Sequence, residues 1–130
     1  MKIIHHNPDT LHKNPAFSQA IEVEGASRML YIGGQDGITV DGKLAGDDLS
    51  TQTEQAYKNV LELLKVAGAT QKDVVKLTIY VVQGQDIREG FAAAQKVWGA
   101  QPTAISVLIV AGLAVPGALV EIEAIAALKD

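Results

Sequence analysis

The last apolar segment of the chain carries two glutamates, Glu121 and Glu123, within the run Val-Glu-Ile-Glu-Ala at positions 120–124. If this run is a strand, both side chains lie on one face about 7 Å apart, because every second residue of a strand points the same way. Two carboxyl groups at that spacing can serve as general acid and general base. A solvated or subunit-facing strand surface is the commoner reason for such a pattern, so both interpretations stay open at this point.

The other residue types that perform chemistry form weaker patterns. The three histidines, His5, His6 and His12, lack the spacing with carboxylates that a site of three or four metal ligands needs, so we expect no metal. The Gly-Gly-Gln-Asp-Gly run at 33–37 lacks the Gly-x-Gly-x-x-Gly spacing of a dinucleotide site. Its backbone amides could contact a small ligand, or its glycines could simply let a strand end. No serine has the Gly-x-Ser-x-Gly context of a hydrolase nucleophile.

Length and composition limit the class of protein. The 130 residues fit one domain, 1–130, with a core built from small aliphatic side chains, since 48% of residues are hydrophobic and only 5% aromatic. The absence of cysteine excludes disulfides and fits a reducing compartment. We find no signal peptide and no apolar run of about 20 residues, so we expect a cytoplasmic protein with no membrane partner. A net charge of -4 with scattered basic residues predicts no nucleic-acid partner.

Periodicity predicts the elements that must position these residues. Alternating apolar residues predict a strand over 17–24, which a Gly-Ala-Ser turn would join to a second strand over 28–32 as a hairpin. A third short strand is expected at 38–40, before the Asp41-Gly42 turn. Helical spacing predicts a helix that begins with a capping box of Thr51 and Glu54 and ends at Gly68.

The rest of the chain predicts a β-branched strand over 74–82, a helix over 86–98 and two strands over 103–110 and 119–127. On the first of these strands Val75, Leu77, Ile79 and Val81 are expected to face one way. This β-β-β-α-β-α-β-β order predicts an α+β fold with a mixed six-stranded sheet and two helices on one face. The other face is too apolar for open water and too polar for a core, which favours burial against another subunit.

Seven short motifs, in order along 17–127, together resemble the RidA/YjgF family, whose members are also labelled endoribonuclease L-PSP. They are FSQA at 17–20, IGGQ at 32–35, QTEQ with KNV at 52–60, AGA at 67–69, VVKLT at 74–78, PT at 102–103 and VEIEA at 120–124. The resemblance implies a chorismate-mutase-like fold, a homotrimer whose sheets form a central barrel, and a small-molecule cleft between subunits. It also implies cofactor-free hydrolysis of reactive enamines and imines to 2-keto acids and ammonia.

The residues expected in the cleft depart from the pattern of the family's deaminases. The family's Pro-x-Arg, whose arginine binds the ligand carboxylate, is Pro-Thr-Ala here, so Ala104 replaces the arginine. The family's tyrosine is Phe17, its serine before Gly-Gln is Gly33, followed by the retained Gly34, and its helical asparagine aligns with Phe91. Glu121 matches the family's glutamate associated with the catalytic water and is retained.

These departures predict a trimer that binds a small metabolite and deaminates 2-imino acids poorly, with Glu121 as candidate catalytic residue. Candidate ligand contacts are Phe17, Gly33, Gly34, Phe91 and Ala104. Two alternatives remain: a deaminase with an altered substrate range, and a non-catalytic ligand-sensing trimer. A role as an endoribonuclease or translation inhibitor fits the acidic balance less well.

Overall fold

The structure is a computed structural model that describes all 130 residues. Six strands and two α-helices follow one another in the order β-β-β-α-β-α-β-β, with one 3-10 turn before the fourth strand. The count of strands before the first helix agrees with the prediction only by compensation, because the strand at Lys2–His6 was not predicted and no strand forms at 38–40. The elements are β1 (Lys2–His6), β2 (Ala20–Glu24), β3 (Arg28–Asp36), α1 (Leu49–Val66), η1 (Gln71–Asp73), β4 (Val74–Val82), α2 (Ile87–Trp98), β5 (Ala104–Val110) and β6 (Val120–Leu128). The α+β class predicted from the sequence is confirmed.

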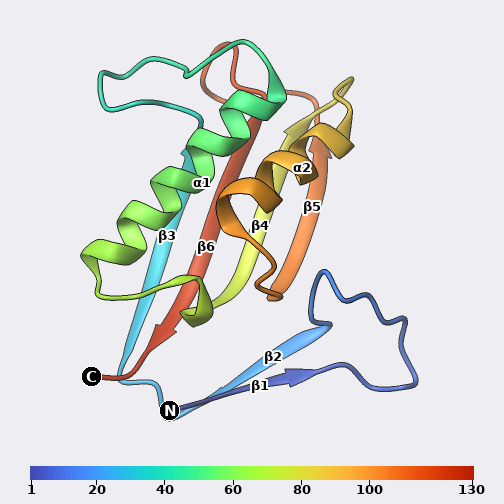
Figure 1. The fold of residues 1–130 in the computed structure, drawn as a ribbon, viewed down its shortest axis with the longest axis vertical. Helices are drawn as coiled ribbons and strands as arrows, with labels where there is room; N and C mark the ends of the chain where they lie inside the picture. Colours follow the sequence, from blue (N-terminus) through green and yellow to red (C-terminus); the bar gives the residue numbers. More distant parts are fainter.

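Four of the strands form one mixed sheet in the order β3-β6-β4-β5 (Figure 1). β6 pairs antiparallel with both β3 and β4, whereas β5 runs parallel to β4. The parallel pair needs a crossover connection, and α2 supplies it. β6 has a neighbouring strand on each side, and its residues that face the helices are almost completely buried.

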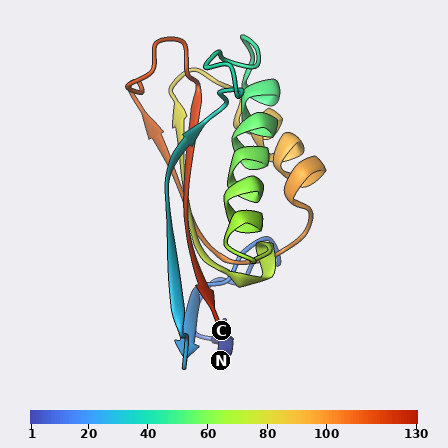
Figure 2. The same cartoon turned by 90° about the vertical axis from the view of Figure 1, so that its left-hand side faces the viewer.

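Both helices cover the same face of this sheet, and the other face is bare (Figure 2). The core lies between the helices and the sheet. It includes Val60 and Leu64 of α1, Leu77 of β4 and Ile122 of β6, each at most 1% exposed. The helical spacing of apolar residues over α1 predicted that one side of this helix is buried. The chain has no helix that is long and apolar enough to cross a membrane.

The predicted six-stranded sheet is wrong, because β1 and β2 form a separate two-stranded ribbon. The predicted hairpin of 17–24 with 28–32 is wrong for the same reason: β2 pairs with β1, and β3 pairs with β6. In Figure 1 the ribbon lies beyond one end of the main sheet. Alternation identifies a strand but not its partner, and the apolar start at 2–6 competes successfully for β2.

Local details also differ from the expectation. The strand expected at 38–40 is reduced to one bridge between Ile38 and Leu44. α1 begins at Leu49 with Asp48 as its N-cap, since the Asp48 carboxylate accepts from the Thr51 amide at 2.9 Å, so the predicted Thr51 capping box is wrong. In β4 a register shift between Val74 and Lys76 places Val74, rather than Val75, in the core.

Candidate functional site

The bare face of the four-stranded sheet carries polar and apolar side chains side by side. We call it the open face. Glu121 and Glu123 both lie on it, because the alternate residues Val120, Ile122 and Ala124 are buried beneath the helices. The prediction that the two glutamates share a face is confirmed. Tyr80 of β4 lies beside them and donates to Glu123 Oε1 at 2.7 Å, which raises the pKa of Tyr80.

Glu121 is packed more closely than its position on an uncovered face suggests. A Cβ atom added to Gly34 would lie 2.5 Å from Glu121 Oε2, so glycine at this position leaves room for the carboxyl group. Asp36 is the register partner of Glu121 on β3 and is only 8% exposed, with Oδ1 lacking a hydrogen-bond partner. Burial raises the pKa of Glu121, and hydrogen bonding to Asp36 and the charges of Asp36 and Glu123 raise it further. A carboxyl group in this environment can hold a proton and return it, as acid–base catalysis requires.

Polar residues of α1 hold the backbone at the Asp36 end of β3. Asn59 Nδ2 donates to the carbonyl oxygens of Asp36 and Ile38 at 3.2 and 2.9 Å. Gln55 Nε2 in turn donates to Asn59 Oδ1 at 2.9 Å, which orients the amide. The helix motif noticed in the sequence therefore has a structural role, because it fixes the chain that carries Asp36 beside Glu121.

Ala104 lies at the opposite end of the sheet from Glu121. It begins β5 in register with Lys76 of β4, whereas Glu121 is in register with Tyr80. Four residues of strand separate Lys76 from Tyr80, which corresponds to roughly 13 Å. Within one chain, a small ligand therefore cannot contact Ala104 and Glu121 at once.

A lysine stands beside Ala104, the residue predicted to replace the deaminase arginine. Lys76 is the register partner of Ala104, and its Nζ atom donates to Ser106 Oγ at 2.8 Å. Alternation along 74–82 puts Lys76 on the same face as Thr78 and Tyr80, but it does not reveal this pairing, which is set by the register between β4 and β5. Both arginines lie elsewhere: Arg28 donates to the Ala67 carbonyl, and Arg88 pairs with Asp86.

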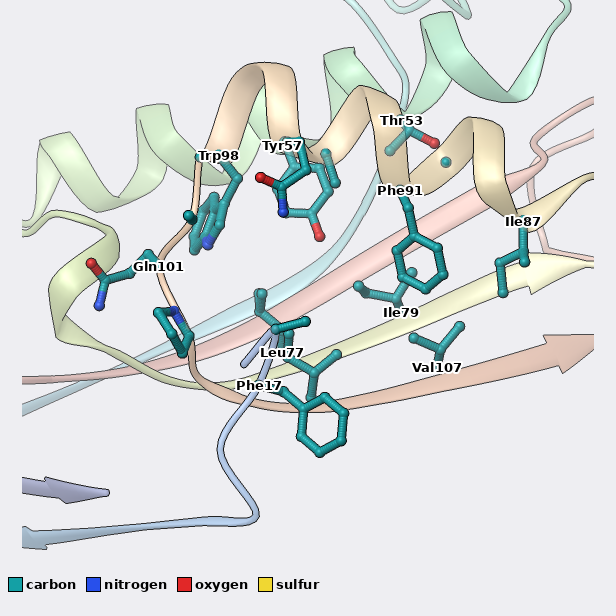
Figure 3. Close-up of a pocket in the computed structure, with 18 of the residues that line it drawn as sticks. Phe17, Thr53, Tyr57, Leu77, Ile79, Ile87, Phe91, Trp98, Gln101 and Val107 are labelled. Atoms are coloured by element: carbon teal, nitrogen blue, oxygen red, sulfur yellow. The ribbon is translucent and has the colours of Figure 1, made fainter. Parts of the chain in front are cut away.

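Phe17 and Phe91 line the same cavity from different places, Phe91 beneath α2 and Phe17 beside β5 (Figure 3). Phe17 precedes β2 in a loop. Phe91 projects from α2 with 54% of its surface exposed, although it falls on the apolar stripe that helical spacing over 86–98 predicts to be buried. Both line a cavity of about 400 Å³ between α2 and the strands β4 and β5. A second hollow of about 350 Å³ on the open face is lined by Gly33, Lys76 and Glu123, among others.

The candidate residues are thus divided among three places on one chain. Gly34 and Glu121 are together on the open face, and Gly33 lies next to them in the hollow lined by Glu123 and Lys76. Ala104 begins β5 beside Lys76, and Phe17 and Phe91 line the cavity under α2. The sequence reading missed Asp36, Lys76, Thr53 and Trp98 as residues of these places. For Asp36 a signal existed, since an acidic residue ends the apolar run of β3.

The histidines do not converge. His5 Nδ1 lies 2.6 Å from Ser18 Oγ, and His6 Nε2 lies 2.7 Å from Glu22 Oε2, both within or beside the ribbon. No group of three or more His, Asp and Glu side chains is placed to hold a metal ion.

Comparison with known proteins identifies the family. The family model described as Endoribonuclease L-PSP matches residues 8–128. The chain is 35% identical to the chloroplastic Reactive Intermediate Deaminase A of Arabidopsis thaliana over 86% of this chain and 58% of that one. It is 32% identical to the human 2-iminobutanoate/2-iminopropanoate deaminase, over 85% of this chain and 78% of that protein.

A solved structure resembles the whole chain. The crystal structure of the Rid-family protein YyfB from Yersinia pestis, described as of unknown function, superposes with a TM-score of 0.86 and 38% identity, and covers 98% of this chain and 100% of that one. With the family model, the deaminase-named relatives and this shared fold in agreement, the chain is a member of the RidA/YjgF family.

Proposed function

We propose that the protein is a homotrimer that binds a small metabolite in clefts between its subunits and that it deaminates 2-imino acids poorly. The observation that carries this proposal is the separation of Glu121 from Ala104 within one chain. A ligand-sized site containing both needs a second copy, in which the Glu121 end of one open face approaches the β5 edge of another. Gly34 and Glu121 would then face Phe17, Phe91 and Ala104 of the neighbouring copy.

The surface supports association. Met29, Tyr31 and Leu108 expose 46%, 72% and 42% of their area, and several exposed large apolar side chains on one face favour a contact surface. The β1–β2 ribbon adds to this argument, because a two-stranded ribbon alone is marginally stable in water and needs to be covered. Deaminase names among the relatives support small-molecule chemistry at such a cleft.

Glu121 is the proposed acid–base group. Its raised pKa, caused first by burial and then by Asp36, brings its protonation closer to the neutral range in which a general acid or base works best. Ala104 offers no cation to a substrate carboxylate, and truncating one partner of a desolvated charge pair typically costs about 2 to 5 kcal/mol of binding. Weak deamination of 2-imino acids is the consequence.

A second candidate function rests on Lys76. As the register partner of Ala104, this lysine could bind a substrate carboxylate as a single point charge, where an arginine would offer a two-pronged contact. The protein would then be a deaminase with an altered substrate range. In a third reading, a non-catalytic ligand-sensing trimer, Glu121 has a structural role only.

The first test measures mass and activity together. Light scattering coupled to size exclusion should report three times the chain mass of 13.7 kDa, and a monomer at micromolar concentration would contradict the proposal. Imino acids generated from serine or leucine by a second enzyme should be hydrolysed slowly by the unaltered protein. Rates typical of arginine-containing deaminases, lost in Lys76→Met, would favour the second candidate.

The second test restores the missing cation. Ala104→Arg should bind small 2-keto acids more tightly than the unaltered protein, with Ala92→Arg on the exposed side of α2 as control for added charge. Any hydrolysis that is found should change its pH–rate profile in Glu121→Gln. If catalysis is unaffected by that substitution, Glu121 is not the acid–base group.

A further inference from the structure

Asp36 has a buried carboxyl oxygen without a hydrogen-bond partner. The residue ends β3 and is only 8% exposed, and its Oδ1 atom is closed to solvent. A buried carboxyl oxygen that accepts no hydrogen bond costs free energy, and native proteins rarely leave one in that state. Because neither water nor a ligand reaches this atom, the donor that it needs has to come from a neighbouring group of the protein.

Glu121 is the neighbour that can supply this donor. It is the register partner of Asp36 across β3 and β6, so the two side chains project from the same side of the sheet. A Cβ atom added to Gly34 of β3 would lie 2.6 Å from Glu121 Cδ, which shows that the Glu121 carboxyl group leans over the strand that carries Asp36. Ionised carboxylates only accept hydrogen bonds, so a bond between these two groups requires a proton on one of them.

The other polar groups around Asp36 and Glu121 are already engaged. Tyr80 of β4 is in register with Glu121, but its hydroxyl donates to Glu123 at 2.7 Å. Asn59 of α1 donates to the backbone oxygen of Asp36 and not to its carboxyl group. All ion pairs of the chain lie elsewhere, so no lysine, arginine or histidine neutralises either carboxyl group.

Two adjacent carboxylates without a cation repel each other, and one proton held between them removes that repulsion. The raised pKa of Glu121, caused first by burial and then by hydrogen bonding to Asp36, agrees with such an arrangement. The backbone of Asp36 is fixed by Asn59, and its Oδ1 atom is buried. Glu121 has the longer side chain and lies on the open face, so it is the group that can carry the proton to a ligand.

From these observations we propose that Glu121 and Asp36 share one proton, which Glu121 donates to the buried Asp36 carboxylate, and that Asp36 is the positioning residue that keeps Glu121 in its acid form. The inference rests on the acid–base role proposed for Glu121, and Asp36 acts through Glu121 rather than on a ligand. When Glu121 gives the proton to a ligand, two adjacent carboxylates remain. Their repulsion favours recovery of a proton from solvent, so the same pair can act first as an acid and then as a base.

The first experiment measures the pKa of Glu121 in the whole protein. A pH titration of the side-chain carboxyl 13C signals of glutamate follows each group, and the signal of Glu121 is the one that disappears in Glu121→Gln. Asp36→Ala removes both the acceptor and its charge, so it should lower the pKa of Glu121. Asp36→Asn should lower this pKa further, because its amide can donate to the ionised Glu121 carboxyl group.

Glu123→Gln is the matched control. It removes one negative charge from the same strand and leaves the proton-sharing partner in place, so it should lower the pKa of Glu121 less than either Asp36 variant does. Circular dichroism and Trp98 fluorescence establish that each variant is folded. A role of Asp36 in folding alone would not produce the order expected for alanine and asparagine.

A second measurement follows stability rather than a single carboxyl group. The stability that the proton gives is full below the ordinary glutamate pKa of 4.5 and is lost as pH rises through the raised pKa of Glu121. Urea unfolding of Asp36→Ala and Asp36→Asn should show a smaller loss over the same pH range. For any hydrolysis that is found, the limb of the pH–rate profile that reports Glu121 should move to lower pH in both variants.

Three results would overturn the proposal. They are an ordinary pKa for Glu121 in the unaltered protein, a pKa of Glu121 that does not fall in the two Asp36 variants, and an equal fall in Glu123→Gln. Failure of the proposed function looks different. A protein that is monomeric, or that has no hydrolytic activity, would still show the expected order of Glu121 pKa values in the carboxyl titration.

Discussion

Replacement of Gln52 by leucine is expected to destabilise the protein strongly, although the two side chains have similar size. Gln52 on α1 is completely buried and makes three hydrogen bonds. Its Nε2 atom donates to the carbonyl oxygens of Gly46 and Gly117 at 2.9 and 3.1 Å, and its Oε1 atom accepts from the Leu119 amide at 2.8 Å. One amide thus joins α1 to the loop before it and to the segment that leads into β6.

The expected magnitude follows from what leucine leaves unpaired. The Leu119 amide loses the Gln52 oxygen, and an unpaired buried donor costs about 1–3 kcal/mol. The Gly46 carbonyl loses its donor in a half-buried place and adds part of a similar cost. Gly117 is exposed, so water can replace the lost donor at its carbonyl. We expect a total loss of about 2–4 kcal/mol in the free energy of unfolding, a large part of the roughly 5–15 kcal/mol of a typical domain.

Urea unfolding, followed by the fluorescence of Trp98 and by circular dichroism, measures this loss. Chain concentration must be equal in all samples, since association would stabilise the folded state. Gln55→Leu, which removes one half-buried hydrogen bond to Asn59, is the control and should cost less than about 1 kcal/mol. A Gln52→Leu loss no larger than that of Gln55→Leu would refute the reasoning.

Three further predictions concern the carboxyl group, a tyrosine and two glycines. Glu121→Gln should raise the melting temperature more at pH 7 than at pH 4. The pKa of Glu121 is raised in the folded protein, so its protonated form stabilises the fold fully below the ordinary pKa of 4.5, and this stabilisation is lost as pH rises through the raised pKa. Glutamine stays uncharged and keeps the fold free of the buried charge at pH 7. An increment that does not vary with pH would contradict this. Alkaline titration of phenolate absorbance should show one group ionising near pH 12 that is missing in Tyr57→Phe. Gly37→Ala should cost at least about 1–3 kcal/mol, because the new Cβ would lie 2.5 Å from the Gln52 backbone oxygen. Gly34→Ala should cost less, because its Cβ would meet only side-chain atoms of Glu121, which can turn away; equal losses would contradict the argument.

Local pattern was sufficient to predict most of the elements. Helical spacing over α1 and α2 and the β-branched run of β4 reflect which residues must be buried, and burial is largely decided within a window of several residues. Family likeness and the shared face of Glu121 and Glu123 were predicted for related reasons, since short motifs and the two-residue period of a strand are visible in the chain itself.

Strand partners were not predictable in the same way. β2 and β3 are adjacent in the sequence and were predicted to pair, yet each prefers a partner elsewhere in the chain. Alternation is compatible with any strand that offers a matching face, so the choice depends on which pairing buries most surface once α1 and α2 have packed.

The candidate site shows most clearly which features the sequence predicts and which depend on the tertiary structure. Sequence alone predicted the roles of Glu121 and Ala104, because both predictions rest on residue identity within short motifs that resemble the family. Only the tertiary structure decided that Asp36 lies beside Glu121, that Lys76 lies beside Ala104, and that Trp98 borders a cavity with its N–H unpaired. The physical reason is that strand register and the distance of a helix from its sheet are set by the packing of the whole domain, which no short stretch of residues encodes.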